Sequence, residues 1–157
     1  MNISRIIVIA MLLAGPAAMA DKGAPATAAK TDKCPVCGMF VAKYPDFLTQ
    51  VIFSDDAHAF FDGAKDMFKY YFNLKKYQPS KKLSDLAFVH VTDYYSVTPI
   101  DGKKAWYVVG SDVFGPMGRE LIPFAKKSDA AEFMKDHAGK KLLRFEEVTP
   151  EIIKGLD

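Results

Sequence analysis

The sequence has little of what enzymes and nucleic-acid-binding proteins usually carry. Only two cysteines and three histidines occur among 157 residues, and two cysteines cannot staple a domain of this size. The formal net charge is +2 and no basic tract stands out, which argues against a nucleic-acid partner. No Ser-His-Asp set, Gly-rich phosphate loop or matched carboxylate pair is present. We therefore expect neither hydrolytic nor nucleotide chemistry, and no enzyme.

A hydrophobic run long enough to span a membrane is also missing. Residues 1–20 carry Arg5, then an apolar stretch that falls short of the roughly 20 residues a spanning helix needs, then a small-x-small site that ends at Ala20. This pattern predicts a secretory signal peptide that is cleaved after Ala20, and a periplasmic mature protein. No cysteine lies near the cleavage site. The sequence therefore offers no lipobox, and we do not expect a membrane tether.

The rest of the chain reads as a leader followed by one domain. Residues 21–33 are rich in Ala, Lys and Thr and show no periodicity, which predicts a flexible leader. Residues 34–157 have the length of one ordinary domain. Half of the whole sequence is hydrophobic, enough for a buried core, so the fold does not depend on the cysteines.

The order of strands and helices is predicted to repeat. In the first half, strands over 49–53 and 57–61 form a hairpin. Asp62 then caps a helix whose apolar residues recur at helical spacing, and a polar loop over 73–84 leads to a strand over 86–95. The apolar helix residues are Ala64, Met67, Phe68, Tyr71 and Phe72.

In the second half, strands over 105–109 and 121–124 precede a helix that Ser128 caps and Gly139 ends, and a strand over 142–148 follows. Each half, 34–98 and 99–157, is thus a strand–strand–helix–strand unit, which suggests an internal duplication. The predicted class is α+β with mainly antiparallel strands.

Sulfur donors are the most informative residues that remain. Cys34, Cys37 and Met39 lie within one short segment, Cys-Pro-Val-Cys-Gly-Met. In an extended segment the side chains of Cys37 and Met39 share a face. Met117 lies far downstream in Gly-Pro-Met-Gly (115–118), a turn in which core packing does not require a long thioether. Thiolate and thioether ligands suit Cu(I), so these four residues are the predicted metal ligands.

Other interpretations of the cysteine pair stay open. A structural zinc site needs four ligands, and two further cysteines or a spaced histidine pair are missing. A thiol–disulfide protein acting through Cys34 and Cys37 is the main alternative, although that motif normally opens a helix after a strand. In an oxidising compartment the pair could also close into a disulfide. His58 and His90 are candidates for an additional copper ligand. His137 is expected near a helix C-terminus, where a histidine interacts favourably with the helix dipole, so it needs no metal to explain its position.

Several motifs occur in an order that resembles one known family. They are Cys-Pro-Val-Cys-Gly-Met (34–39), Val-Thr-Asp-Tyr (91–94), Ala-Trp-Tyr-Val (105–108), Gly-Pro-Met-Gly (115–118) and Leu-Ile-Pro-Phe (121–124). Together they resemble the nitrous oxide reductase accessory protein NosL family, over residues 34 to about 148. The resemblance implies a fold similar to that of organomercury lyase, built from two strand–helix units.

The resemblance also implies a function. A member of this family would be a periplasmic Cu(I) chaperone that serves assembly of the copper–sulfide centre of nitrous oxide reductase, beside a membrane transporter complex. Cys37 matches the family motif Cys-Gly-Met, and Cys34 is an additional thiol. Members are usually lipoproteins, a feature for which this sequence has no lipobox cysteine.

Overall fold

The computed structural model describes residues 23–157, and the predicted signal peptide lies outside the described residues. The helices and strands are β1 (Thr49–Phe53), β2 (His58–Phe61), α1 (Ala64–Phe72), α2 (Leu74–Tyr77), β3 (Leu86–Thr92), β4 (Pro99–Asp101), β5 (Trp106–Gly115), β6 (Gly118–Phe124), α3 (Lys127–Asp136), β7 (Lys141–Arg144) and α4 (Pro150–Lys154). Short 3₁₀ turns cover Val41–Lys43, Pro45–Phe47, Leu83–Asp85 and Phe145–Glu147. Within this part of the chain, no helix is long and apolar enough to cross a bilayer.

The two antiparallel sheets share one topology. In the first sheet the strand order is β2-β1-β3-β4, and in the second it is β6-β5-β7. In each, the first strand lies between its hairpin partner and the strand that returns after a helix. This repeated order confirms the predicted α+β class with antiparallel strand–strand–helix–strand units.

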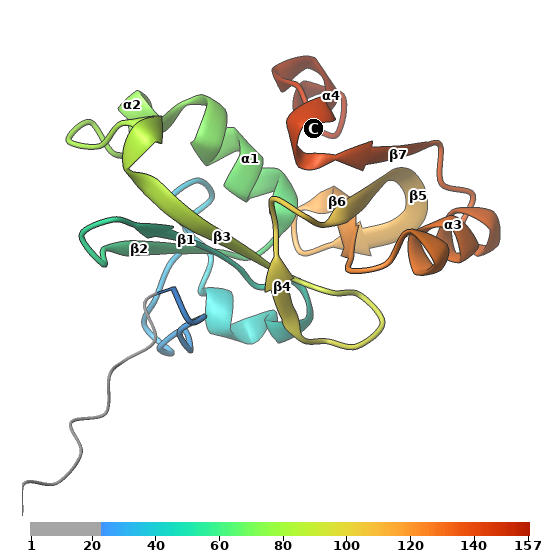
Figure 1. Ribbon diagram of the computed structural model, residues 1–157, viewed down its shortest axis with the longest axis horizontal. Helices are drawn as coiled ribbons and strands as arrows, with labels where there is room; N and C mark the ends of the chain where they lie inside the picture. The colour runs from blue at the N-terminus through green and yellow to red at the C-terminus, as the bar shows by residue number, and fades with distance from the viewer. Residues whose placement is uncertain (1–22) are drawn as a thin grey trace, which may run out of the picture.

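Helix α1 lies between the two sheets (Figure 1), because it is apolar on more than one side. Its residues Met67 and Phe68 are completely buried. They belong to a core that includes Val51 and Phe61 from the first sheet and Tyr107 from the second. Burying apolar side chains of this size stabilises the fold by about 1.5–3 kcal/mol each. Helix α1 therefore joins the two halves.

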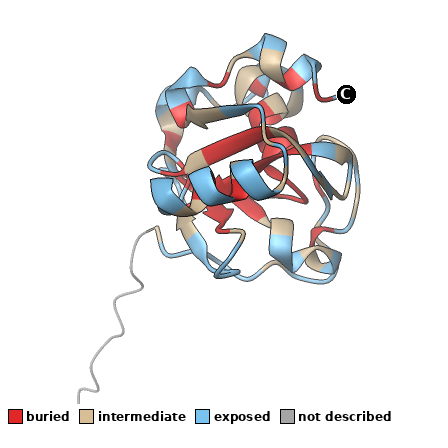
Figure 2. Cartoon of the chain, turned by 90° about the vertical axis from the view of Figure 1, so that its right-hand side faces the viewer, coloured by how far each residue is buried: buried red, intermediate tan, exposed pale blue. Residues whose placement is uncertain are grey.

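A smaller core lies on the other face of the second sheet. Val108 and Ile122 point away from α1 and pack against Phe133 of α3. The alternation along β5, with Tyr107 in the larger core and Val108 in the smaller one, follows from the two-residue period of a strand. The outward face of α3 stays exposed, in front of the buried strands (Figure 2).

The described part of the leader contacts the first sheet. The backbone N–H of Ala26 donates to Gln50 Oε1 (2.9 Å), and the carbonyl of Gly23 lies 2.7 Å from His90 Nε2. Lys33 pairs with Phe40 in an isolated antiparallel bridge. The flexibility of residues 21–33 stays a prediction.

Several predicted boundaries were wrong for local reasons. The strand expected over 86–95 ends at Thr92, because Asp93 Oδ1 accepts the N–H groups of Tyr95 (3.2 Å) and Ser96 (2.9 Å) and closes a turn. The helix expected to end at Gly139 ends at Asp136, since Ala138 adopts φ +51°. Elements that the sequence analysis did not predict are α2, β4 and α4.

The predicted helix caps were wrong as well. Gly63 is the N-cap of α1, and Ser128 lies inside α3, whose N-cap is Lys126. Asp62, the predicted cap, makes no capping hydrogen bond to α1. Its carboxylate is turned toward a cysteine, as described next.

Candidate metal centre

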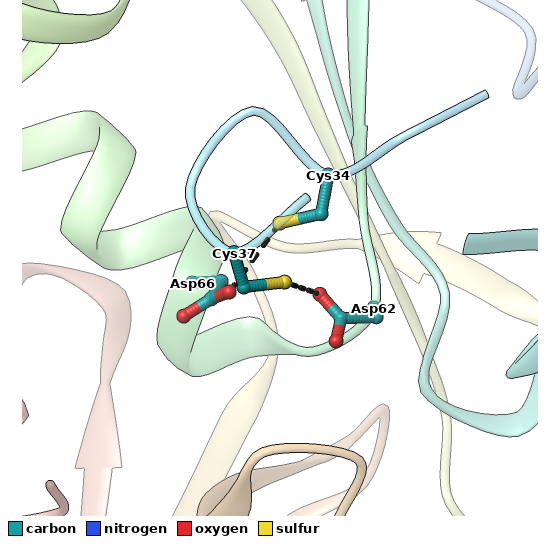
Figure 3. A group of neighbouring side chains, drawn as sticks. All are labelled: Cys34, Cys37, Asp62 and Asp66. Atoms are coloured by element: carbon teal, nitrogen blue, oxygen red, sulfur yellow. Dashed lines mark hydrogen bonds between the residues drawn. The ribbon is translucent and has the colours of Figure 1, made fainter. Parts of the chain in front are cut away.

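The loop that carries both cysteines is closed by its own backbone. The N–H of Gly38 donates to the carbonyl of Cys34, and the N–H of Cys34 donates to the carbonyl of Met39, each at 2.9 Å. Gly38 has φ +80°, a conformation that residues with a side chain rarely adopt. The sharp reversal keeps Cys34 and Cys37 on one compact loop. Figure 3 shows both thiols beside the start of the helix that carries Asp66.

Two buried carboxylates face the two thiols. Cys34 Sγ donates to Asp66 Oδ2 (3.3 Å), and Cys37 Sγ donates to Asp62 Oδ1 (3.2 Å). Asp62 and Asp66 are only 1% and 2% exposed. One ligand atom from each of the four residues lies within 4.8 Å of all the others. This cluster, Cys34, Cys37, Asp62 and Asp66, is called the thiol–carboxylate cluster below.

The environment of the cluster keeps the thiols protonated when no metal is bound. Burial raises the pKa of Cys34 far above its usual range, and the charge of Asp66 raises it further. Burial raises the pKa of Cys37 to about 12, with a contribution from the hydrogen bonds to the carboxylates. An attacking cysteine in a dithiol enzyme usually shows the opposite shift, toward a lower pKa. Cys34 and Cys37 are not joined by a disulfide in the structure.

The turn that carries Met117 is fixed to the helix that carries Asp66. Lys65 Nζ donates to the carbonyl of Met117 (2.8 Å), and Lys65 directly precedes Asp66 on the first turn of α1. Lys65 is itself buried, and its ammonium also reaches the carbonyl of Leu156 (3.3 Å). The Met117 side chain is 44% exposed. Two segments that carry predicted ligands, far apart in sequence, thus meet the same end of α1.

A buried glutamate on the β5–β6 hairpin forms a second hydrogen-bonded contact with α1. Glu120 Oε1 accepts the backbone N–H groups of Lys65 (2.5 Å) and Leu121 (2.8 Å). Burial raises the pKa of Glu120 to about 8, although both N–H groups and the Lys65 ammonium favour its ionised form. A Cβ at Gly63 would overlap the Glu120 carboxylate. This close approach of helix and hairpin needs a glycine at that position.

The remaining predicted ligands have different surroundings. Met39 is half-buried, directly after the turn at Gly38. His90 is bonded to the carbonyl of Gly23 (2.7 Å), and His58 is exposed at the start of β2. Among residues 23–157, the thiol–carboxylate cluster contains no histidine.

Sequence reasoning missed Asp62 and Asp66. Asp62 was interpreted as a helix cap, and Asp66 attracted no attention among the apolar residues of its helix. Helical spacing does not relate them, because Asp62 precedes the N-cap Gly63 and only Asp66 lies in α1. What joins them to the cysteines is a contact across 25 and 32 residues of sequence, which no local pattern encodes.

The fold and the cluster define a class of protein: an α+β domain with a compact, thiol-containing candidate metal site at a helix N-terminus. A profile of the NosL family matches residues 25–153. The chain therefore belongs to the NosL family.

Individual relatives agree with this assignment. The chain is 32% identical over 132 residues to the copper-binding lipoprotein NosL of Stutzerimonas stutzeri, and the match covers 79% of this chain and 65% of that relative. It therefore spans about two thirds of that curated protein's length. The crystal structure of the copper chaperone NosL from Shewanella denitrificans superposes with a TM-score of 0.68 at 26% identity, over 81% of this chain and 96% of that one.

Proposed function

We propose that this protein is a periplasmic Cu(I) carrier that binds one copper ion through Cys37, Met39 and Met117, joined by Cys34. One observation carries the proposal: the two thiols and the Met117 turn are held at the same end of α1, the turn by the Lys65 hydrogen bond. These donors are soft sulfur atoms, the ligands that Cu(I) prefers.

The arrangement suits transfer better than catalysis. Cys37 is only partly buried and Met117 is exposed, so a partner's thiolate or thioether can reach the copper and displace these ligands in turn. Cys34 is 1% exposed and would be the last ligand to leave. The similar proteins are named as copper-binding and copper-chaperone proteins, which supports carriage rather than an enzymatic reaction.

The proposed client is the apo-form of nitrous oxide reductase, during assembly of its copper–sulfide centre in denitrification. A membrane transporter complex of the same system is the proposed partner at the envelope. Family membership supports both. The lipoprotein name of the Stutzerimonas relative supports export, and the cysteine-free cleavage site leads us to propose a form without lipid.

The test is a competition titration of the reduced mature protein with Cu(I) against a chromophoric chelator. We expect one Cu(I) per monomer and a loss of affinity of about tenfold or more for Met117→Ala, with a larger loss for Cys37→Ser, because each removes one of few ligands. Phe114→Ala is the matched control, since it shortens an exposed apolar side chain in the same hairpin without removing a sulfur. X-ray absorption of the loaded protein should show a sulfur-dominated shell.

The same series separates copper carriage from dithiol chemistry. In a thiol–disulfide protein both Cys34→Ser and Cys37→Ser would abolish activity, whereas Met117→Ala would have no effect. Copper binding by Met117→Ala that equals the wild type would contradict the proposed ligand set. The raised pKa of both thiols argues against the dithiol function. Copper transfer to the apo-reductase, measured with loaded protein, tests the client.

A further inference from the structure

The surface around the C-terminal end of α1 carries an excess of positive charge. Two neighbouring pockets open there, one between α1, α2 and α4 and one between α2 and the loop that leads to β3, and both are lined by Phe72, Asn73 and Lys76. Among the residues that line the two pockets only Asp157 is acidic, whereas the whole chain has 21 basic and 19 acidic residues. The lining lysines define what is called the lysine face below: Lys69, Lys75, Lys76, Lys81, Lys82 and Lys154.

Most of these lysines have no carboxylate partner within the protein. Lys69 is paired with Asp157, and Lys81 is paired with Asp55. The others are exposed and form no salt bridge within residues 23–157; they are Lys75, Lys76, Lys82 and Lys154. Like charges gathered on one surface repel one another and attract anions from solution. The lysine face is therefore complementary to a surface of negative charge.

Apolar side chains lie between the unpaired lysines. The larger pocket, of about 550 Å³, is lined by Tyr71, Leu74 and Leu83, and Leu83 is 47% exposed. Lys76 Nζ lies 5.0 Å from the centre of the Tyr77 ring. Lysines, tyrosines and an exposed leucine together suit the boundary of a lipid bilayer, where ammonium groups reach the phosphates while aromatic rings and aliphatic side chains lie deeper. The chemistry of the face thus favours anionic lipid as its partner.

The lysine face lies at the opposite end of α1 from the cysteines. Asp66, which contacts the Cys34 thiol, is in the first turn of α1, whereas Phe72 is its last residue. A helix of nine residues is about 13 Å long. Figure 1 shows α2 at the end of α1 that is remote from β6. A membrane that contacts the lysine face would therefore leave the thiols open to a partner protein.

We propose that the lysine face docks this protein on an anionic phospholipid bilayer. The ammonium groups contact the lipid phosphates, and Leu83 and the neighbouring tyrosine rings enter the region between headgroups and acyl chains. The contact is reversible, because each lysine adds only about fivefold in affinity for an anionic surface. Docking needs neither copper nor a protein client and rests only on the proposed export. It holds the proposed lipid-free form beside the membrane.

The experiment is co-sedimentation of the reduced, metal-free mature protein with vesicles. One set of vesicles is phosphatidylcholine alone, and the other is equal parts of phosphatidylcholine and phosphatidylglycerol. We expect binding to the anionic vesicles only, and weaker binding as the salt concentration rises. The double variant Lys75→Gln with Lys82→Gln should bind about 25-fold more weakly, at about fivefold for each lysine. Leu83→Ala should also weaken binding several-fold, because it removes apolar surface from the contact.

The matched control is the double variant Lys126→Gln with Lys135→Gln. It removes the same charge from two exposed lysines at the ends of α3, on the other side of the molecule from α2 (Figure 1), and should bind as the wild type does. Equal binding by the two double variants would overturn the proposal, as would unchanged binding of Leu83→Ala. Failure of the wild type to bind anionic vesicles would also overturn it and leave an acidic protein as the occupant. Copper affinity should be unchanged in every variant, so these results and the copper titration are decided separately.

Discussion

Replacing Glu120 by glutamine should change how the stability of the protein depends on pH. Glu120 is buried between α1 and the β5–β6 hairpin, and burial raises its pKa to about 8 from the ordinary 4.5. Between these two values the folded protein holds a proton at Glu120 that the unfolded chain has released. The free energy of unfolding of the wild type should therefore fall as the pH rises through this interval.

The magnitude follows from the two pKa values. At about 1.4 kcal/mol for each pH unit, the wild type should lose about 4 kcal/mol of stability from this group between pH 5 and pH 8.5. Glu120→Gln resembles the protonated side chain and can still accept from the N–H groups of Lys65 and Leu121. It should therefore lack this loss and become the more stable protein at the alkaline end.

The assay is urea unfolding of the metal-free, reduced protein at several pH values, with the variant's free energy subtracted from that of the wild type. Subtraction removes the histidines and other groups that titrate in both proteins. Glu132→Gln, on the exposed side of α3, is the control and should follow the wild type. Parallel pH profiles for wild type and Glu120→Gln would refute the reasoning, because they would mean that the backbone donors keep Glu120 ionised despite its burial.

Two further predictions concern the contact between α1 and the β5–β6 hairpin and the export of the protein. Gly63→Ala should lower the free energy of unfolding by about 1–3 kcal/mol, because the added Cβ would overlap the Glu120 carboxylate, although the extended backbone at this position is unstrained. Thermal melts measure the effect, with Gly155→Ala as the control because its Cβ would make only ordinary contacts. An unchanged melting temperature for Gly63→Ala would contradict the close approach of α1 and the hairpin. Intact-mass measurement of protein recovered from the periplasm should give a chain that begins at Asp21, and a mass increased by acyl chains would show a lipid anchor instead.

The fold was largely predictable because its signals are local. The short strand-forming runs of β1 and β2, the helical spacing from Ala64 to Phe72 and the apolar run of β3 each lie within a short window of sequence. The sequence did not predict the elements that form mainly through tertiary contacts. Strand β4 is a short segment that pairs with β3 through a long turn, and α4 is a single turn or so, capped by Thr149, that packs on α1.

Only half of the candidate site was predictable, because its residues meet through tertiary contacts that no local pattern encodes. Cys34, Cys37 and Met117 are rare or oddly placed residue types, so the sequence alone draws attention to them. Nothing in the sequence distinguishes Asp66 from other aspartates, whereas in the structure it is buried against the thiol of Cys34. The two carboxylates that face the thiols come from a different segment, and only the fold brings their oxygens within 4.8 Å of the sulfur atoms.

The two aspartates of the cluster bear on copper release. In the metal-free protein the S–H groups of Cys34 and Cys37 satisfy one oxygen of Asp66 and one of Asp62. When Cu(I) takes the sulfur atoms, these hydrogen bonds are lost and two buried carboxylates face two thiolates. Like charges at such distances repel strongly in a buried site. In the proposed carrier this repulsion weakens the hold on copper at the thiols, so that a partner without neighbouring carboxylates can take the ion.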